Sequence, residues 1–263
     1  MFESIKRGVT VFMLSQKYAW MSAFSYRLPF FVYLFYAALD PIFSLIFVGI
    51  IYSISNGIAG WNYFQLLALV GSATILYFGY TYFVNYSKLS DALRKGEIDV
   101  YLNKPYNTFT MMLVQYPNNY QLGGLVGGIA LFAYAASNLS LGAIAILSYV
   151  VLMGAGVLVL MMFVLMLTAL TYKQFGSGDW IDWLGGILFD VAKYPLTIYG
   201  FFGGLLLTFI IPVGLASYYP SAALLQQLSI ANIIGLILLA LAFVLITRKV
   251  FYFSMKHYAS GGG

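Results

Sequence analysis

The chain contains no cysteine, and only 8% of its 263 residues are charged. The absence of cysteine excludes disulfides, iron–sulfur clusters and thiol chemistry. The charged fraction is far below the roughly 25% that is usual in a soluble domain, whereas 62% of the residues are hydrophobic. The composition therefore predicts a single integral membrane domain over residues 1–263, without a separate soluble domain.

Groups suited to catalysis are equally scarce. The single histidine, His257, lies near the C-terminus beside a lysine and reads as a solvated residue. There is no HExxH, no GxSxG, no pair of acids within an apolar run and no GxxxxGK[ST] phosphate-binding loop. We therefore expect no enzyme, no catalytic residue, no metal site and no cofactor bound by this chain itself.

The thirteen basic residues are confined to four short patches. The patches are Lys6–Arg27, Lys88–Lys104, Lys173–Lys193 and Arg248–Lys256, and the uncharged runs between them are Pro41–Ser87, Pro105–Tyr172 and Tyr194–Thr247. Each run has room for a hairpin of two spans of about 20 residues. Positive charge marks the cytoplasmic side, so the layout predicts a multi-pass protein of the inner (cytoplasmic) membrane with both termini cytoplasmic. Basic residues in such positions orient the chain and meet lipid headgroups, which excludes a nucleic-acid partner despite the net charge of +5.

The expected fold is all-α, with six transmembrane helices after an amphipathic interfacial helix. The interfacial helix is expected over about 2–20, and the spans over about 28–52, 63–86, 111–134, 141–172, 198–215 and 232–247. The start of the third span is ambiguous, because Tyr116-Pro117-Asn118-Asn119 either kinks a helix or precedes it. Before the last span, 217–228 reads as a short re-entrant or interfacial outer helix, with a plain loop as the alternative.

Asp40 is the only ionisable residue well inside an expected span. It lies 13 residues after Arg27, or about 20 Å along a helix. Two interpretations stay open: an acceptor of hydrogen bonds at a kink made by Pro41, or a residue that lines a pathway.

Glycines four residues apart let helix backbones approach closely. Gly123 with Gly127, and Gly200 with Gly204, have this spacing. We expect these pairs to mediate tight helix packing.

Two charged segments are expected on the cytoplasmic side. Residues 90–95 read as a short helix that Ser90 caps and Gly96 ends. The connection continues to Pro105, longer than a simple turn needs, which favours docking onto a soluble partner. Residues 179–193 have an amphipathic pattern that predicts a helix at the inner membrane surface.

These features favour the membrane half of a transporter that a separate ATPase drives. A channel or a passive membrane-organising protein is the alternative, although a channel is expected to show a filter-like loop or a charged ring. With 23 tyrosines and 22 phenylalanines, a conduit through such spans suits amphiphiles: lipids, lipid-linked glycans, hydrophobic peptides or drugs.

The chain also resembles the permease subunits of type-two ABC exporters, in particular a small six-span subgroup. The resemblance covers essentially the whole length and rests on five segments: Leu93-Arg-Lys-Gly-Glu-Ile-Asp-Val-Tyr-Leu-Asn-Lys-Pro105, Ala192-Lys-Tyr-Pro-Leu-Thr-Ile-Tyr199, Leu207-Thr-Phe-Ile-Ile-Pro212, Tyr219-Pro220 and Lys256-His-Tyr-Ala-Ser-Gly261. It implies a permease that pairs with a second, identical or paralogous permease above two ATP-binding cassette subunits, which bind ATP and Mg.

The resemblance also implies that the loop after the second span couples the permease to the ATPase. The implied coupling residues are Leu93, Arg94, Glu97, Ile98, Asp99, Tyr101 and Lys104. Leu93, Ile98 and Tyr101 are expected to fill a groove of the ATPase, while the charged residues set its orientation.

Overall fold

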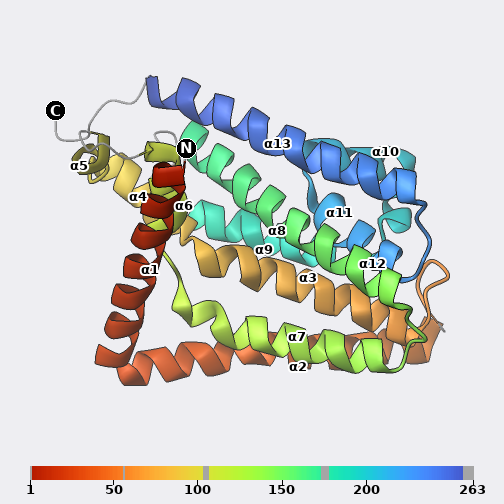
Figure 1. The fold of residues 1–263 in the computed structure, drawn as a ribbon. Coiled ribbons are helices and arrows are strands. Elements are labelled where there is room, and N and C mark those ends of the chain that lie inside the picture. The colour runs from red at the N-terminus through yellow and green to blue at the C-terminus, as the bar shows by residue number, and fades with distance from the viewer. Residues whose placement is uncertain (1, 56, 103–106, 173–177, 257–263) are drawn as a thin grey trace.

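The computed structural model of the protein describes every residue except 1, 56, 103–106, 173–177 and 257–263, and the described chain is essentially all helical (Figure 1). Its helices are α1 (Phe2–Ser25), α2 (Arg27–Ser55), α3 (Tyr63–Phe83), α4 (Tyr86–Lys95), α5 (Asp99–Leu102), α6 (Thr108–Val114), η1 (Asn119–Gln121), α7 (Leu122–Ser137), α8 (Ala143–Thr171), α9 (Asp179–Ala192), η2 (Leu196–Tyr199), α10 (Gly200–Leu205), η3 (Leu206–Ile210), α11 (Val213–Ala216), α12 (Tyr218–Leu224) and α13 (Ile230–Lys256).

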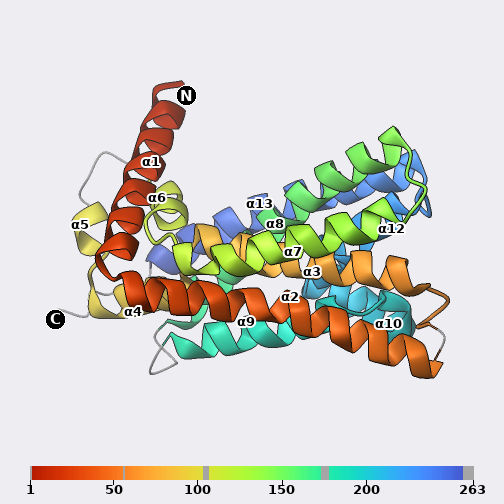
Figure 2. The same ribbon diagram turned by 90° about the horizontal axis from the view of Figure 1, so that it is seen from below.

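Within the described chain, five helical segments are long and apolar enough to cross a membrane. They are Arg27–Ser55, Tyr63–Lys95, Asn119–Ser137, Ala143–Thr171 and Ile230–Lys256. A sixth span arises if α9 and the following segment Leu196–Ile210, which meet at a bend of 104°, are counted as one broken span. The long helices lie side by side as a bundle (Figures 1 and 2). The predicted all-helical membrane fold with about six spans is confirmed.

The basic residues gather at one end of this bundle. Apart from Lys193, those in the described chain lie in α1, at the start of α2, in α4 and in the last part of α13. Figure 1 shows these elements at the same end. The connections at the other end, 57–62, 138–142 and 225–229, contain no charged residue. We call these the basic end and the uncharged end.

Helix α3 forms the centre of the bundle and packs against α7, α8 and α9. Its middle is fully buried, as at Leu67 and Leu69. The Ser72 hydroxyl lies 3.0 Å from the Tyr149 hydroxyl on α8 and accepts a hydrogen bond of 3.2 Å from Ser221 on α12. The short helix α12 is therefore tied into the interior near the uncharged end, which agrees with the expected short helix before the last span.

The glycines of α7 allow it to approach α2. A methyl group at Gly127 would lie 2.7 Å from Cγ of Pro41, and one at Gly123 would overlap the carbonyl group of Leu34. Within this chain the second pair makes no such approach. A methyl group at Gly200 or Gly204 would meet no atom within 4 Å, because these residues lie in the exposed helix α10.

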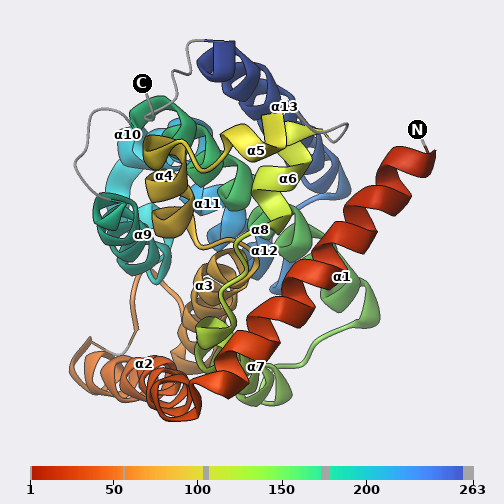
Figure 3. The same ribbon diagram turned by 90° about the vertical axis from the view of Figure 1, so that its left-hand side faces the viewer.

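Helix α1 crosses the basic end of the bundle instead of joining the long helices (Figure 3). Aromatic contacts attach it: the rings of Phe12 and Phe83 are 6.1 Å apart, and those of Trp20 and Phe30 are 5.9 Å apart. Its position fits the interfacial helix that the sequence predicts.

Backbone hydrogen bonds join two helix breaks near the basic end. The N–H of Asn85, between α3 and α4, donates to the carbonyl of Tyr116 at 2.6 Å, and the N–H of Asn118 donates to that of Tyr82 at 2.9 Å. Pro117 cannot donate a backbone hydrogen bond. The helix expected over 111–134 is therefore interrupted, and its apolar part begins at Asn119.

The region around the expected fifth span differs most from the sequence prediction. Residues 198–215 form no single helix, because η2 ends at Gly200, which has φ 67°, and Pro212 separates η3 from α11. The helix placed at the inner surface by its pattern, α9, instead runs alongside the long helices (Figures 1 and 2) and packs on α3 and α4. Its 14 residues extend about 21 Å. The surface interpretation of 179–193 is wrong, because α9 lies along the bundle beside α3 and not across its basic end.

Candidate functional site

The connection from α4 to α5 forms a defined turn at the basic end. Asn85 caps α4 by accepting from the N–H of Lys88 at 2.9 Å, so the helix begins before the predicted cap at Ser90. Gly96 ends the helix in the left-handed conformation, at φ 75°, as predicted. Glu97 N–H then donates to the Ala92 carbonyl at 3.0 Å. Such a C-cap fixes the direction of the chain after the helix.

The two faces of this turn differ in exposure. Arg94, Lys95, Glu97 and Val100 are exposed, and Asp99 is half-buried. By contrast, Leu93 and Ile98 are almost completely buried, at 1% and 0% exposure, within the core of this chain. In this structure these two side chains hold the turn in place and cannot fill a groove of another protein. The side chain of Tyr101, all of Lys104 and His257 lie outside the described residues.

Contacts with α8 and α9 fix the turn to the bundle. The hydroxyl of buried Tyr86 donates to the Met161 carbonyl at 2.9 Å. Asp91 accepts from the N–H of Gly178 at 3.2 Å and pairs with Arg94 at 3.3 Å. The turn is therefore in direct contact with α8 and with the residue that precedes α9. We call the exposed residues Arg94, Lys95, Glu97 and Val100, together with half-buried Asp99, the turn surface.

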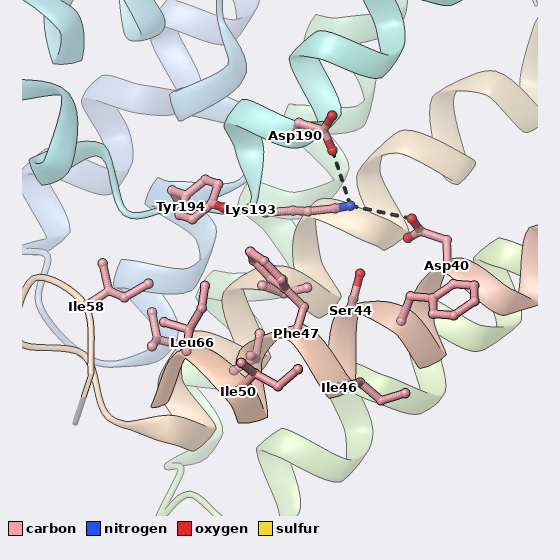
Figure 4. Close-up of a pocket in the computed structure, with 14 residues that line it drawn as sticks. Asp40, Ser44, Ile46, Phe47, Ile50, Ile58, Leu66, Asp190, Lys193 and Tyr194 are labelled. Carbon is pink, nitrogen blue, oxygen red and sulfur yellow. Dashed lines mark hydrogen bonds and ion pairs between the residues drawn. The ribbon is translucent and has the colours of Figure 1, made fainter. Parts of the chain in front are cut away.

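A second polar constellation lies halfway along α2, where Asp40 meets α9. Lys193 places its ammonium nitrogen 3.5 Å from Oδ1 of Asp40 and 3.4 Å from Oδ1 of Asp190 (Figure 4). The same nitrogen lies 3.8 Å from the centre of the Phe189 ring. Oδ2 of Asp40 is buried and has no hydrogen-bond partner within the described chain. Sequence reasoning found Asp40 but assigned Lys193 to the cytoplasmic patch, so it missed this ionic cluster.

Two pockets meet at this cluster, and Asp40 and Phe43 line both. The first, the apolar pocket, has a volume of about 650 Å³ and extends along α2 past Phe47 and Ile50 to Leu66. Figure 4 shows these side chains on one side of the ion pair. It is a wide, mostly hydrocarbon-lined space next to a charged site.

The second, the polar pocket, has a volume of about 700 Å³. Its polar lining residues come from α2, α3, α9 and the breaks around α4 and η1: Tyr33, Tyr36, Asp40, Tyr77, Asn85, Lys88, Asn118, Tyr120, Gln121 and Asp182. Because Asn85, Lys88 and Asn118 line it, this pocket extends to the helix breaks near the basic end. Together the two pockets form a groove over α3 between α2 and α9, which we call the α2–α9 groove.

The groove offers groups that are suited to binding a ligand. In the described part of the chain no three His, Cys, Asp or Glu residues are grouped so that they could hold a metal ion. Charges, hydroxyl groups and aromatic faces next to an apolar space suit a molecule with a polar head and a hydrocarbon part.

Comparison with known proteins identifies one family. A family model described as "ABC-2 family transporter protein" matches residues 38–262. No curated protein and no solved structure matches the chain.

Proposed function

The chain belongs to the ABC-2 family of transporter membrane proteins, and from this we propose that it is the transmembrane subunit of an exporter that moves an amphiphilic substrate. The observation that carries the proposal is the combination of the family match over residues 38–262 with the α2–α9 groove, which joins a polar and an apolar pocket. The energy comes from ATP hydrolysis in separate subunits, since the sequence has no phosphate-binding loop.

The turn surface is the proposed contact with the ATPase. It lies at the basic end, which positive charge marks as cytoplasmic, and it is exposed around Glu97 and Val100. Asp91 and Tyr86 connect this turn to the start of α9 and to α8. A movement of the ATPase would therefore shift α9, the helix that Lys193 follows. The proposed contact with the ATPase therefore consists of the exposed neighbours of Leu93 and Ile98 and not of these two buried residues.

A second permease completes the proposed assembly. The outer face of α2 exposes large apolar residues, including Phe35, Ile42 and Phe43, and the α2–α9 groove is open along this face. A second copy or a paralogue opposite α2 would turn an open groove into an enclosed path. Two ATP-binding subunits, with ATP and Mg, would complete the complex.

The proposal predicts that an ATP-binding cassette subunit co-purifies with the tagged chain and that its ATPase activity depends on the turn surface. Replacing Glu97 and Asp99 by lysine reverses two charges there, so we expect loss of assembly or ATP turnover uncoupled from transport. Lys249→Glu is the control, because Lys249 is exposed on α13 near the same end, and it should retain coupling. Normal coupling in the Glu97→Lys/Asp99→Lys variant would refute the role of this surface.

A further inference from the structure

The α2–α9 groove carries an excess of negative charge although the chain is basic. Its lining includes three carboxylates, Asp40, Asp182 and Asp190, but only two ammonium groups, Lys88 and Lys193. The whole chain has a net charge of +5. Because charges in a low-dielectric groove are screened less than at the surface, this local excess attracts cations and repels anions.

The walls of the polar pocket are also suited to a cation. Tyr33, Tyr36, Tyr77 and Tyr120 line it, and Tyr77 stacks on Phe189 with ring centres 4.6 Å apart. Aromatic faces attract ammonium groups, and this attraction grows when water is excluded. A quaternary ammonium group, which donates no hydrogen bond, can be held by such walls and by carboxylates together.

Lys193 shows how an ammonium group is held at this place. Its nitrogen contacts two carboxylates and an aromatic ring at the same time. One ammonium shared between Asp40 and Asp190 leaves the cluster under-neutralised, and Oδ2 of Asp40 has no partner among the residues that the structure describes. A ligand cation that reaches Asp40 therefore gains attraction and competes with Lys193.

We infer that the α2–α9 groove selects amphiphiles with a cationic, ammonium-type head, which lies in the polar pocket near Asp40 and Asp182 while the hydrocarbon part occupies the apolar pocket. This inference deepens the proposed function by naming the substrate class. Each pocket is large enough for a drug-sized group, since ligand pockets have volumes of about 300–1,000 Å³.

The test uses three probes with the same hydrocarbon core: diphenylhexatriene, its trimethylammonium derivative and its propionic acid derivative. Binding to the purified chain in dodecyl maltoside, an uncharged detergent, is followed by energy transfer from tryptophan. We expect saturable binding of the cationic probe with a Kd at least about ten-fold below that of the anionic probe. Equal or tighter binding of the anionic probe, or no saturable binding at all, would overturn the inference.

Two variants give effects of opposite sign. Asp40→Asn should weaken binding of the cationic probe about ten-fold, whereas Lys193→Met, which removes the competing ammonium, should strengthen it by a similar factor. If Lys193 were instead a receptor for anionic heads, Lys193→Met would weaken anion binding and leave the cation unchanged. Asp179→Asn is the control, because Asp179 lies on α9, the helix that precedes Lys193, but lines neither pocket.

The double variant Asp40→Asn/Lys193→Met guards against misfolding caused by an unpaired charge. It should elute as the wild-type protein does on size exclusion and should bind the cationic probe about ten-fold more weakly than Lys193→Met does, because the carboxylate of Asp40 is gone. Binding of the cationic probe as tight as in Lys193→Met would contradict the role of Asp40. These measurements need no ATPase, so their failure is distinguishable from failure of the coupling experiment.

Discussion

Lys193 and Asp40 are 153 positions apart in the sequence, yet their charged groups approach to 3.5 Å in the middle of the bundle. Asp40 belongs to α2, and Lys193 directly follows α9. Their pairing joins two helices that otherwise flank an open groove. The contact thus contributes both to the stability of the fold and to the shape of the proposed transport path.

Removal of this pairing should destabilise the protein. A hydrogen bond to a charged group contributes about 1.5–3 kcal/mol to the free energy of unfolding. In Asp40→Asn, Lys193 still donates to Asp190. We therefore expect this variant to lower the free energy of unfolding by about 1–3 kcal/mol. Asp190→Asn should have a smaller effect, because the Asp190 side chain is 75% exposed. Unfolding temperatures in detergent measure the stability lost by each variant. The exchange Asp40→Lys/Lys193→Asp should restore part of the stability that Asp40→Asn loses. An equal loss in both single variants would show that the pair adds no more than a surface contact.

The approach of α7 to α2 should depend on Gly123. A methyl group there overlaps the Leu34 carbonyl, and backbone must shift to accommodate it, so Gly123→Ala should lower the free energy of unfolding by about 1–3 kcal/mol. Gly204→Ala is a matched control, because a methyl group at Gly204 meets no atom within 4 Å. The control should be neutral or slightly stabilising, since alanine favours helix more than glycine does. Equal unfolding temperatures for the two variants would contradict the packing described here.

Single cysteines can report the orientation of the chain, because it has none of its own. Lys95 is exposed at the basic end and Ser140 is exposed at the uncharged end. The positive-inside rule predicts that a membrane-impermeant maleimide labels Ser140→Cys in intact cells and labels Lys95→Cys only after permeabilisation. Labelling of Lys95→Cys in intact cells would reverse the orientation and remove the basis for an ATPase at that end.

The sequence predicted the parts of the fold that depend on local pattern and on the membrane. Uncharged runs and basic patches predicted the number of spans, and Gly96 predicted the end of α4. The start of α4 was placed too late because Asn85, a good cap, follows directly after an apolar helix. The breaks within 198–215 were missed because Gly200 and Pro212 were not weighed as helix breaks, and the run around them was treated as one span.

The site was less predictable because it depends on tertiary contacts. The buried positions of Leu93 and Ile98 follow from how the turn packs on this chain, which no local pattern shows. One signal for the ionic pair was present: Asp40 lies 13 residues after Arg27, and Lys193 lies 14 residues after Asp179. If both helices enter from the same end, these nearly equal spacings bring the two residues to about the same depth.

The most direct test of coupling through the turn surface is photo-crosslinking from position 100, where Val100 is 59% exposed. A crosslinking amino acid at Val100, in the chain purified with its ATPase, should form an adduct with the ATP-binding subunit. The same group at Ser140, at the opposite end, should form none with that subunit. An active complex that yields no adduct with the ATPase from position 100 would contradict the account.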